Sequence, residues 1–324
     1  MEQRRLGGSG LVVSAVGLGC NNFGRPGTAT GTAEGARAAI DACLDVGIGF
    51  FDVADAYGSP RGRSEELLGE ALQGRRDRAV VATKFGADMG GANGGDFESR
   101  ASRRYVRHAV EASLRRLGTD WIDLYQLHRP EPLTPIGETL SALDDLVREG
   151  KIRYVGHSNL AGWEIADAAW TARSSGLVAP ISAQDHYSLL ERDVEREVIP
   201  ACEHFGLGML PYFPLASGLL SGKYRRGELP PAGSRLSGRQ QLLDSAPWDR
   251  IEMLGAFAAE RGLSLLDVAI GGLAAQPTVA SVIAGATTPD QVRANAAALQ
   301  WRPDTDDLTE LDTICPPGHS SAAL

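Results

Sequence analysis

The sequence predicts an α/β protein whose eight parallel strands close into a (β/α)8 barrel. Short apolar segments of five to seven residues recur along the chain, and amphipathic stretches with helical spacing lie between them. No repeat of fixed period and no low-complexity linker divides the 324 residues. Strand–helix units repeated eight times form a closed parallel barrel with the helices outside. We therefore expect a single barrel domain over residues 1–324.

The eight predicted strands are rich in Val, Ile, Leu or aromatic residues and too short to be helices. They are "AVGLG" (15–19), "IGFFD" (48–52), "AVVATK" (79–84), "IDLYQLH" (122–128), "IRYVGHS" (152–158), "PISAQ" (180–184), "LGMLPY" (207–212) and "VASVI" (279–283).

Helical spacing of apolar residues predicts helices over 33–46, 65–72, 103–117 and 136–147. We expect Ser64 to cap the second of them. The last helix is expected to begin at "TPDQ", where Thr288 and Gln291 form a capping box and Pro289 takes the first helical position.

Two segments lie outside the repeating pattern. Residues 4–14, "RRLGGSGLVVS", are typical of a two-strand hairpin around glycines 7–10 that precedes the barrel. Residues 214–247 are rich in Gly, Pro, Ser and Arg and are too long for an ordinary connection, so they indicate a functional loop.

Composition narrows the class of partner. Hydrophobic residues make up 43% of the chain, charged residues make up 23%, and the net charge is -9. This charge argues against nucleic acid or an anionic membrane surface as the main partner, although a local site can still bind an anionic small molecule. We expect no signal peptide and no membrane span, because glycine and serine interrupt the apolar N-terminal stretch.

The cysteines and histidines indicate a reducing compartment and no metal. The four cysteines are scattered and form no C-x-x-C pair, and no two of the six histidines are spaced i, i+4. We therefore expect a cytoplasmic protein without a zinc site.

Polar residues at the strand ends are the candidate catalytic groups. In a parallel barrel, catalytic residues lie at the C-terminal ends of the strands. The second strand ends at Asp52, with Tyr57 just beyond it, and the third and fourth end at Lys84 and His128. Barrel closure brings these four side chains to one side of the mouth.

These four residue types suit proton delivery to an oxygen atom. A tyrosine has a reference pKa of about 10, and a nearby ammonium favours its phenolate form. An aspartate would hold the lysine in place, and a histidine would donate a hydrogen bond to a substrate oxygen. Carbonyl reduction needs such a group, together with a hydride that side chains cannot supply. Each residue alone also fits a plain turn or a solvated strand end, and only the joint placement of the four indicates a catalytic site.

The chain resembles the aldo-keto reductase superfamily over nearly its whole length. The motifs that carry the resemblance are "FFDVADAYG", "GRSEELLGEAL", "VVATK", "DLYQLHRP", "GKIRYVGHSN", "PLASGLLSGKY" and "VIAGATTPDQVRAN". They are most similar to the bacterial reductases and potassium-channel β subunits. The resemblance implies a catalytic tetrad of Asp52, Tyr57, Lys84 and His128, and a nicotinamide cofactor held without a G-x-G-x-x-G fingerprint.

The same resemblance implies the cofactor-binding residues. Ser158, Asn159 and Gln184 would bind the carboxamide, and Tyr212 would stack on the nicotinamide ring. The segment from Leu215 through Gly218 to Leu219, with Lys223, would contact the pyrophosphate. The adenosine end would be held by Gly285, Thr287, Thr288, Gln291 and Asn295, although Gln291 could equally serve only as a helix cap.

The choice between NADP and NAD depends on what replaces the expected basic residues. Family members that prefer NADPH usually carry Lys or Arg where this chain has Thr287, Thr288 and Gln291. Arg293 would point to a different helix face. We expect NADP, with NAD also accepted.

The resemblance implies an oxidoreductase that acts on an aldehyde, ketone or sugar. A redox-sensing regulatory subunit is the alternative, and a lyase or isomerase would need a metal or phosphate site that the sequence does not show. The substrate pocket is expected to involve Phe23, the "GGANGG" loop (90–95), Trp163 and the 214–247 loop.

Overall fold

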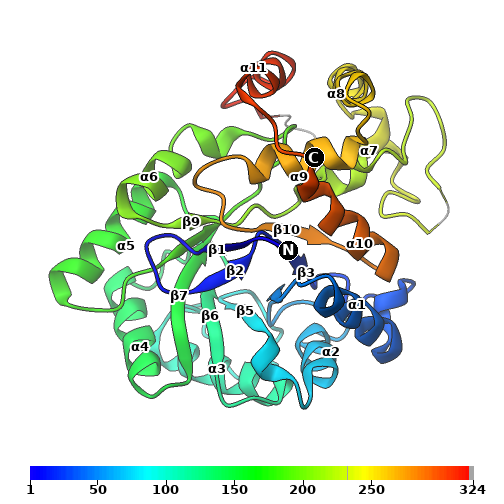
Figure 1. The fold of residues 1–324 in the computed structure, drawn as a ribbon. Helices are drawn as coiled ribbons and strands as arrows, with labels where there is room; N and C mark the ends of the chain where they lie inside the picture. The colour runs from blue at the N-terminus through cyan, green and yellow to red at the C-terminus, as the bar shows by residue number, and fades with distance from the viewer. Residues whose placement is uncertain (232, 321–324) are drawn as a thin grey trace.

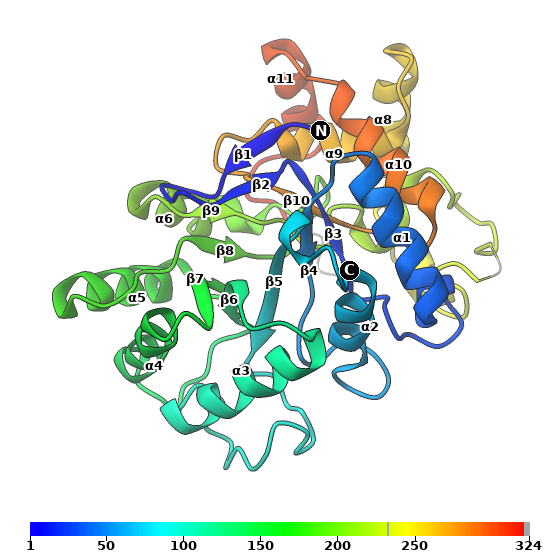
Figure 2. The same cartoon turned by 60° about the horizontal axis from the view of Figure 1, so that its bottom comes forward.

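In the computed structural model, which describes residues 1–231 and 233–320, eight parallel strands form one curved sheet surrounded by helices (Figures 1 and 2). The strand order is β10-β3-β4-β5-β6-β7-β8-β9. The strands are β3 (Val16–Gly19), β4 (Phe50–Asp52), β5 (Val80–Phe85), β6 (Ile122–Leu127), β7 (Ile152–Ser158), β8 (Ser182–Gln184), β9 (Gly208–Met209) and β10 (Val282–Gly285).

Backbone hydrogen bonds join the two edge strands and close the barrel. Met209 N–H donates to Thr278 O at 2.8 Å, Ala280 N–H donates to Met209 O at 3.0 Å, and Ile283 N–H donates to Pro211 O at 2.9 Å. The predicted (β/α)8 class is therefore confirmed. All eight predicted strands exist, although β9 is shorter than the predicted 207–212 and β10 begins later than residue 279.

Among residues 1–231 and 233–320, eight α-helices each follow one barrel strand, and three more α-helices are additional. The eight are α1 (Ala33–Asp45), α2 (Arg63–Leu72), α3 (Arg103–Leu117), α4 (Ile136–Arg148), α5 (Gly162–Ser175), α6 (Val198–Phe205), α9 (Leu265–Ala274) and α10 (Pro289–Ala297). The additional helices are α7 (Gln240–Asp244), α8 (Trp248–Glu260) and α11 (Thr305–Ile314). Figures 1 and 2 both show α8 and α11 on the side of the barrel away from α3.

Two helix-end predictions need correction. Ser64 is not the cap of α2, because the helix begins at Arg63 after Gly62, whose φ of 89° is left-handed. The Ser64 hydroxyl instead donates to Cys20 O at 2.7 Å and ties α2 to the end of β3. The helix at "TPDQ" is not the last, because α11 follows it.

Of the capping box predicted for α10, the structure confirms only the bond made by the side chain of Thr288. Thr288 Oγ1 accepts from Gln291 N–H at 3.3 Å, and Pro289 lies at the helix start. The Gln291 side chain, however, accepts from Thr287 N–H at 2.8 Å and not from the backbone of Thr288. The segment 285–288 is thereby held against the helix N-terminus, at the C-terminal end of β10.

The predicted hairpin exists as β1 (Gln3–Arg5) and β2 (Val12–Ser14) and packs against the N-terminal ends of the strands. At its turn, Gly7 has a φ of 58°, and a Cβ there would come within 2.4 Å of Gly206 O. Leu6 is fully buried with apolar residues of the barrel interior, including Phe50 and Leu124. The hairpin therefore fills this end of the barrel and leaves the opposite end for a site.

The 214–247 loop has a core of its own. Leu219, Leu220, Tyr224 and Leu236 are buried with residues of α8, α9 and α11. Residue 232 lies outside the described part of the loop. A segment packed in this way is a structured cover at the C-terminal side of the barrel, held in place by the additional helices.

Candidate active site

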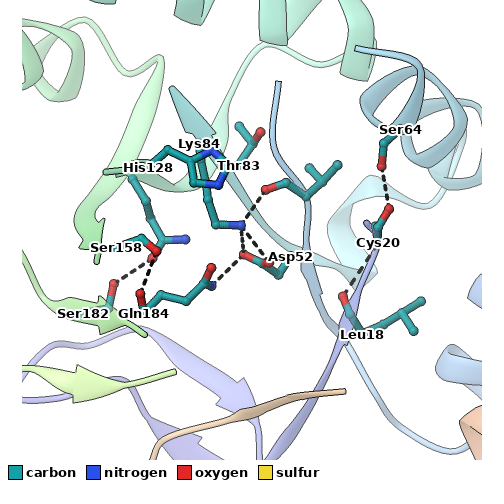
Figure 3. Close-up of polar contacts among 12 residues, drawn as sticks. Leu18, Cys20, Asp52, Ser64, Thr83, Lys84, His128, Ser158, Ser182 and Gln184 are labelled. Atoms are coloured by element: carbon teal, nitrogen blue, oxygen red, sulfur yellow. Dashed lines mark hydrogen bonds and ion pairs between the residues drawn. The ribbon is translucent and has the colours of Figure 1, made fainter. Parts of the chain in front are cut away.

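A buried ion pair lies at the ends of β4 and β5 (Figure 3). Lys84 Nζ donates to both carboxylate oxygens of Asp52 at 2.8 Å and to Val53 O at 3.0 Å. Lys84 is 0% exposed and Asp52 is 4% exposed. Desolvation by itself would lower the pKa of Lys84, but the adjacent Asp52 and Tyr57 outweigh it and the pKa is raised. The ammonium therefore stays charged at neutral pH.

Tyr57 and His128 lie next to this pair. Lys84 Nζ is 5.2 Å from the centroid of the Tyr57 ring, and the rings of Tyr57 and His128 meet edge to face with centroids 5.7 Å apart. The structure thus brings all four predicted catalytic residues together at the C-terminal ends of β4, β5 and β6 and on the loop after β4.

The pKa of Tyr57 is raised and not lowered, contrary to the expectation from its lysine neighbour. Burial raises the pKa of the phenol above 10.0, and the charge of Lys84 only partly offsets this effect. The sequence shows the sign of the neighbouring charge but not the degree of desolvation. A phenol with a raised pKa is protonated at neutral pH, so the Tyr57 hydroxyl carries its proton there.

His128 is expected to stay neutral over the physiological range. Burial lowers its pKa to about 3, with the positive charges of Lys84 and Arg129 acting in the same direction. At a pH between 3 and the ordinary histidine pKa of 6.5, His128 binds a proton in the unfolded chain but not in the folded one. The contribution of His128 to stability is thus complete above pH 6.5 and is lost as the pH falls toward 3.

Side-chain NMR checks this expectation. Comparison of wild type with His128→Asn assigns the ring signal of His128, which should not titrate from pH 8 down to pH ~4. A titration midpoint between pH 6 and 7 for that signal would contradict the assignment of a neutral imidazole.

A cavity of about 1110 Å³ opens above these residues, slightly larger than the ~300–1,000 Å³ range of ligand pockets. Asp52, Tyr57 and His128 contribute to its lining. Twelve of the thirteen predicted cofactor-binding residues also line it: Ser158, Asn159, Gln184, Tyr212, Leu215, Gly218, Lys223, Gly285, Thr287, Thr288, Gln291 and Asn295. Leu219 lies outside this lining, and its side chain is buried in the core that the 214–247 loop forms with α8, α9 and α11.

The amide side chains of the cavity are linked to the ion pair. Gln184 Nε2 donates to Asp52 Oδ1 at 2.8 Å (Figure 3). Since a carboxylate only accepts, the amide nitrogen must face Asp52, which leaves the amide oxygen for a donor in the cavity. Ser158 Oγ donates to the backbone oxygen of Gln184 at 2.6 Å. Gln184 therefore both fixes Asp52 and offers an acceptor to a ligand.

Asn159 connects this group to the aromatic side of the cavity. Its backbone has a φ of 62°, a left-handed conformation that Asn tolerates better than most residues. Asn159 Nδ2 donates to His128 O at 3.0 Å and to Ser158 Oγ at 2.9 Å. Its Oδ1 accepts from the Tyr212 hydroxyl at 2.7 Å. The Tyr212 ring is stacked on His186, with centroids 5.6 Å apart.

The loop side of the cavity carries cationic groups. Backbone φ values of 58° at Ser217 and 98° at Gly218 turn the chain sharply beneath Lys223, which also lines the cavity. The guanidinium of Arg235 lies 4.7 Å from the centroid of the Phe213 ring. Burial lowers the pKa of Arg235, and the charges of Arg25 and Arg239 add to that lowering. No carboxylate pairs with Arg235 within residues 1–231 and 233–320.

Several lining residues were not predicted from the sequence. They include Arg129 and Phe213, and the segment from Asn21 to Ala29 apart from Phe23 and Gly24. The others are Gly19, Leu266, Ile283 and Ala294, while Ser221 and Arg235 lie in the predicted 214–247 loop but were not singled out. Phe23 and Trp163 do not contribute to the described lining, and neither does the loop 90–95: Phe23 is fully buried, and Trp163 is 67% exposed on α5. Of the four segments expected at the substrate pocket, only the 214–247 loop lines the cavity.

No group of three or more His, Cys, Asp or Glu side chains suited to a metal ion occurs in the described chain. Among the helices of residues 1–231 and 233–320, none has the length and apolarity required to cross a bilayer.

Comparison with known proteins agrees with this geometry. The model of the aldo/keto reductase family matches residues 15–315. A Bacillus subtilis protein described as an uncharacterized oxidoreductase is 36% identical over 322 residues, covering 98% of this chain and 96% of the relative. A "probable voltage-gated potassium channel subunit beta" of Oryza sativa is 36% identical over 314 residues, covering 94% and 92%. The L-glyceraldehyde 3-phosphate reductase of Escherichia coli is 33% identical over 325 residues, covering 96% and 92%. The chain belongs to the aldo/keto reductase family.

Proposed function

We propose that the protein is a nicotinamide-dependent oxidoreductase that interconverts a carbonyl compound and an alcohol, with Tyr57 as the proton donor. The observation that carries this proposal is the buried Lys84–Asp52 pair beside Tyr57 and His128, on one wall of a cavity large enough for a dinucleotide and a small substrate. The oxidoreductase names of several relatives support the same class of activity.

The residues of the cavity fit a nicotinamide dinucleotide. Lys223 and Arg235 would contact its phosphates, and a carboxamide would lie against Ser158, Asn159 and Gln184, where the amide oxygen of Gln184 would accept its N–H. The exposed face of Tyr212 would contact the nicotinamide ring. When bound, the dinucleotide supplies the hydride, which side chains cannot provide.

The chain's own residues donate the proton in reduction and accept it in oxidation. In the reducing direction, Tyr57 gives its phenolic proton to the carbonyl oxygen, and Lys84 stabilises the phenolate that forms. Asp52 holds Lys84 in place with two hydrogen bonds, and Gln184 holds Asp52. His128, neutral at pH 7, donates a hydrogen bond to the same substrate oxygen. In the oxidising direction, the phenolate takes the proton back.

A turnover assay tests this proposal. Purified protein should oxidise NADPH or NADH in the presence of an aldehyde, as followed by the loss of the dihydronicotinamide absorbance. The relative described as a potassium channel subunit favours a second candidate, a subunit that binds the dinucleotide with little turnover. Tight dinucleotide binding without turnover across aldehydes, ketones and sugars would support that candidate over the enzyme.

We expect the protein to accept both NADPH and NADH, with the first preferred by less than a thousandfold. Thr287, Thr288 and Gln291 offer no cation to a 2′-phosphate, and Arg293 is paired with Asp290 at 2.8 Å. A charge-assisted phosphate contact contributes about 1.5–3 kcal/mol, so its loss should remove about one to two decades of preference. Dissociation constants for the two cofactors measure this directly. A preference above a thousandfold would show that another cation, with Arg235 the first to examine, binds the 2′-phosphate.

A further inference from the structure

The charge of the cavity lining is opposite to that of the whole protein. The chain has a net charge of -9, but the lining contains four cationic side chains, Arg25, Arg129, Lys223 and Arg235. Asp52 is the one carboxylate among the described lining residues, and Lys84 neutralises it. Such a cavity concentrates the field of its cations on a ligand and favours an anionic one.

Three of these cations lie on the side of the cavity proposed for the dinucleotide phosphates. Lys223 and Arg235 belong to the 214–247 loop, and the positive charge of Arg25 acts on Arg235. Arg129 has different neighbours. It directly follows His128 in the chain and lines the cavity together with His128 and Tyr212, the residues proposed to contact the substrate oxygen and the nicotinamide ring. Its charge acts on both of them. Arg129 therefore lies at the reacting end of the cavity.

The backbone that carries Arg129 is firmly held. His128 N–H donates to Phe85 O at 2.8 Å, and His128 O accepts from Asn159 Nδ2 at 3.0 Å. These two bonds fix the chain immediately before Arg129 between β5 and β7. The Arg129 side chain is exposed, and no hydrogen bond or ion pair engages it within the described residues. Its guanidinium is free to bind a ligand next to His128.

We propose that Arg129 is a specificity-determining residue that binds a carboxylate or phosphate group on the carbonyl substrate. This inference rests on the proposed function, and it names the class of substrate: small aldehydes or ketones that carry an anionic group. A guanidinium binds either anion through two parallel hydrogen bonds, which also fixes the orientation of the substrate relative to Tyr57. Both anions share this chemistry, and the experiment separates them.

The test compares charged and neutral substrates of the same skeleton. The carboxylate arm uses 4-carboxybenzaldehyde against its methyl ester, and the phosphate arm uses glyceraldehyde 3-phosphate against glyceraldehyde. The ratio of kcat/KM, charged over neutral, should be roughly ten to a hundred in wild type for at least one arm, because charge-assisted bonds contribute that much. The arm with the larger ratio identifies the anion. The difference between charged and neutral substrates should appear mainly in KM, and it should become smaller as salt is added.

Variants then assign the effect to one residue. Arg129→Gln should bring the ratio close to one, and Arg129→Lys should restore part of it. Arg153→Gln is the matched control, because Arg153 is exposed on β7 and is not among the lining residues, so this variant should keep the wild-type ratio. A wild-type ratio near one in both arms overturns the proposal, as does a ratio that survives in Arg129→Gln. Failure to reduce any of the four compounds would instead count against the proposed function.

Discussion

Replacing Tyr57 by phenylalanine should lower kcat for carbonyl reduction by about 10²–10⁴-fold, the usual contribution of a positioned general acid. The change removes one hydroxyl and keeps the ring that lies against His128. The fold and the residues on β7, β8 and β10 that we propose to bind the dinucleotide should therefore be unaffected. Steady-state reduction of an active aldehyde by wild type and variant measures the effect.

Cofactor binding provides the control for this variant. The dissociation constant for NADPH, measured by protein fluorescence, should match that of wild type within a factor of about three, because no phosphate or carboxamide contact is changed. A Tyr57→Phe protein that binds the cofactor normally and keeps near wild-type kcat would show that the proton comes from another group.

Replacing Lys84 by methionine should abolish most of the activity and also destabilise the fold. A buried phenol that has lost the neighbouring ammonium is a still weaker acid than its already raised pKa implies. In addition, the variant leaves Asp52 buried without a counter-charge, and breaking a buried pair in this way costs about 3–5 kcal/mol. Both kcat and the free energy of unfolding should fall.

A double variant separates the two effects. Asp52→Asn combined with Lys84→Met removes the unpaired charge, so the free energy of unfolding should recover most of its loss. The activity should not recover, because the ammonium beside Tyr57 is still missing. Recovery of activity along with stability would mean that Lys84 acts only as a structural partner of Asp52.

The barrel, and the placing of polar residues at its C-terminal end, can be predicted from the sequence because both depend on local patterns. Apolar segments give the strands, and the polar residue that ends each strand must lie at the barrel mouth, as Asp52, Lys84 and His128 do. The additional helices α8 and α11 were missed because their apolar residues pack against the 214–247 loop and not against the sheet. No strand alternates with them, so the repeating pattern does not indicate them.

Other features depend on tertiary contacts that a local pattern does not contain. Ser64 has the residue type of a helix cap, but Cys20 O lies within reach of its hydroxyl, and Gly62 supplies the left-handed turn before the helix. The direction of the Tyr57 pKa depends on how completely the barrel mouth is desolvated. Arg129 and Arg235 are separated by more than a hundred residues in the sequence, and only the folded chain brings both into the lining of one cavity.

Hydride transfer from the cofactor to carbon is the central claim, and isotope labelling tests it most directly. The protein is incubated with an aldehyde and NADPH that carries two deuterium atoms at C4 of the nicotinamide, and the alcohol product is examined by mass spectrometry. We expect one deuterium in each alcohol molecule, bound to the former carbonyl carbon, at a rate that Tyr57→Phe lowers by about 10²–10⁴-fold. An alcohol product without deuterium, or bound cofactor that is never oxidised by any carbonyl compound, would contradict it.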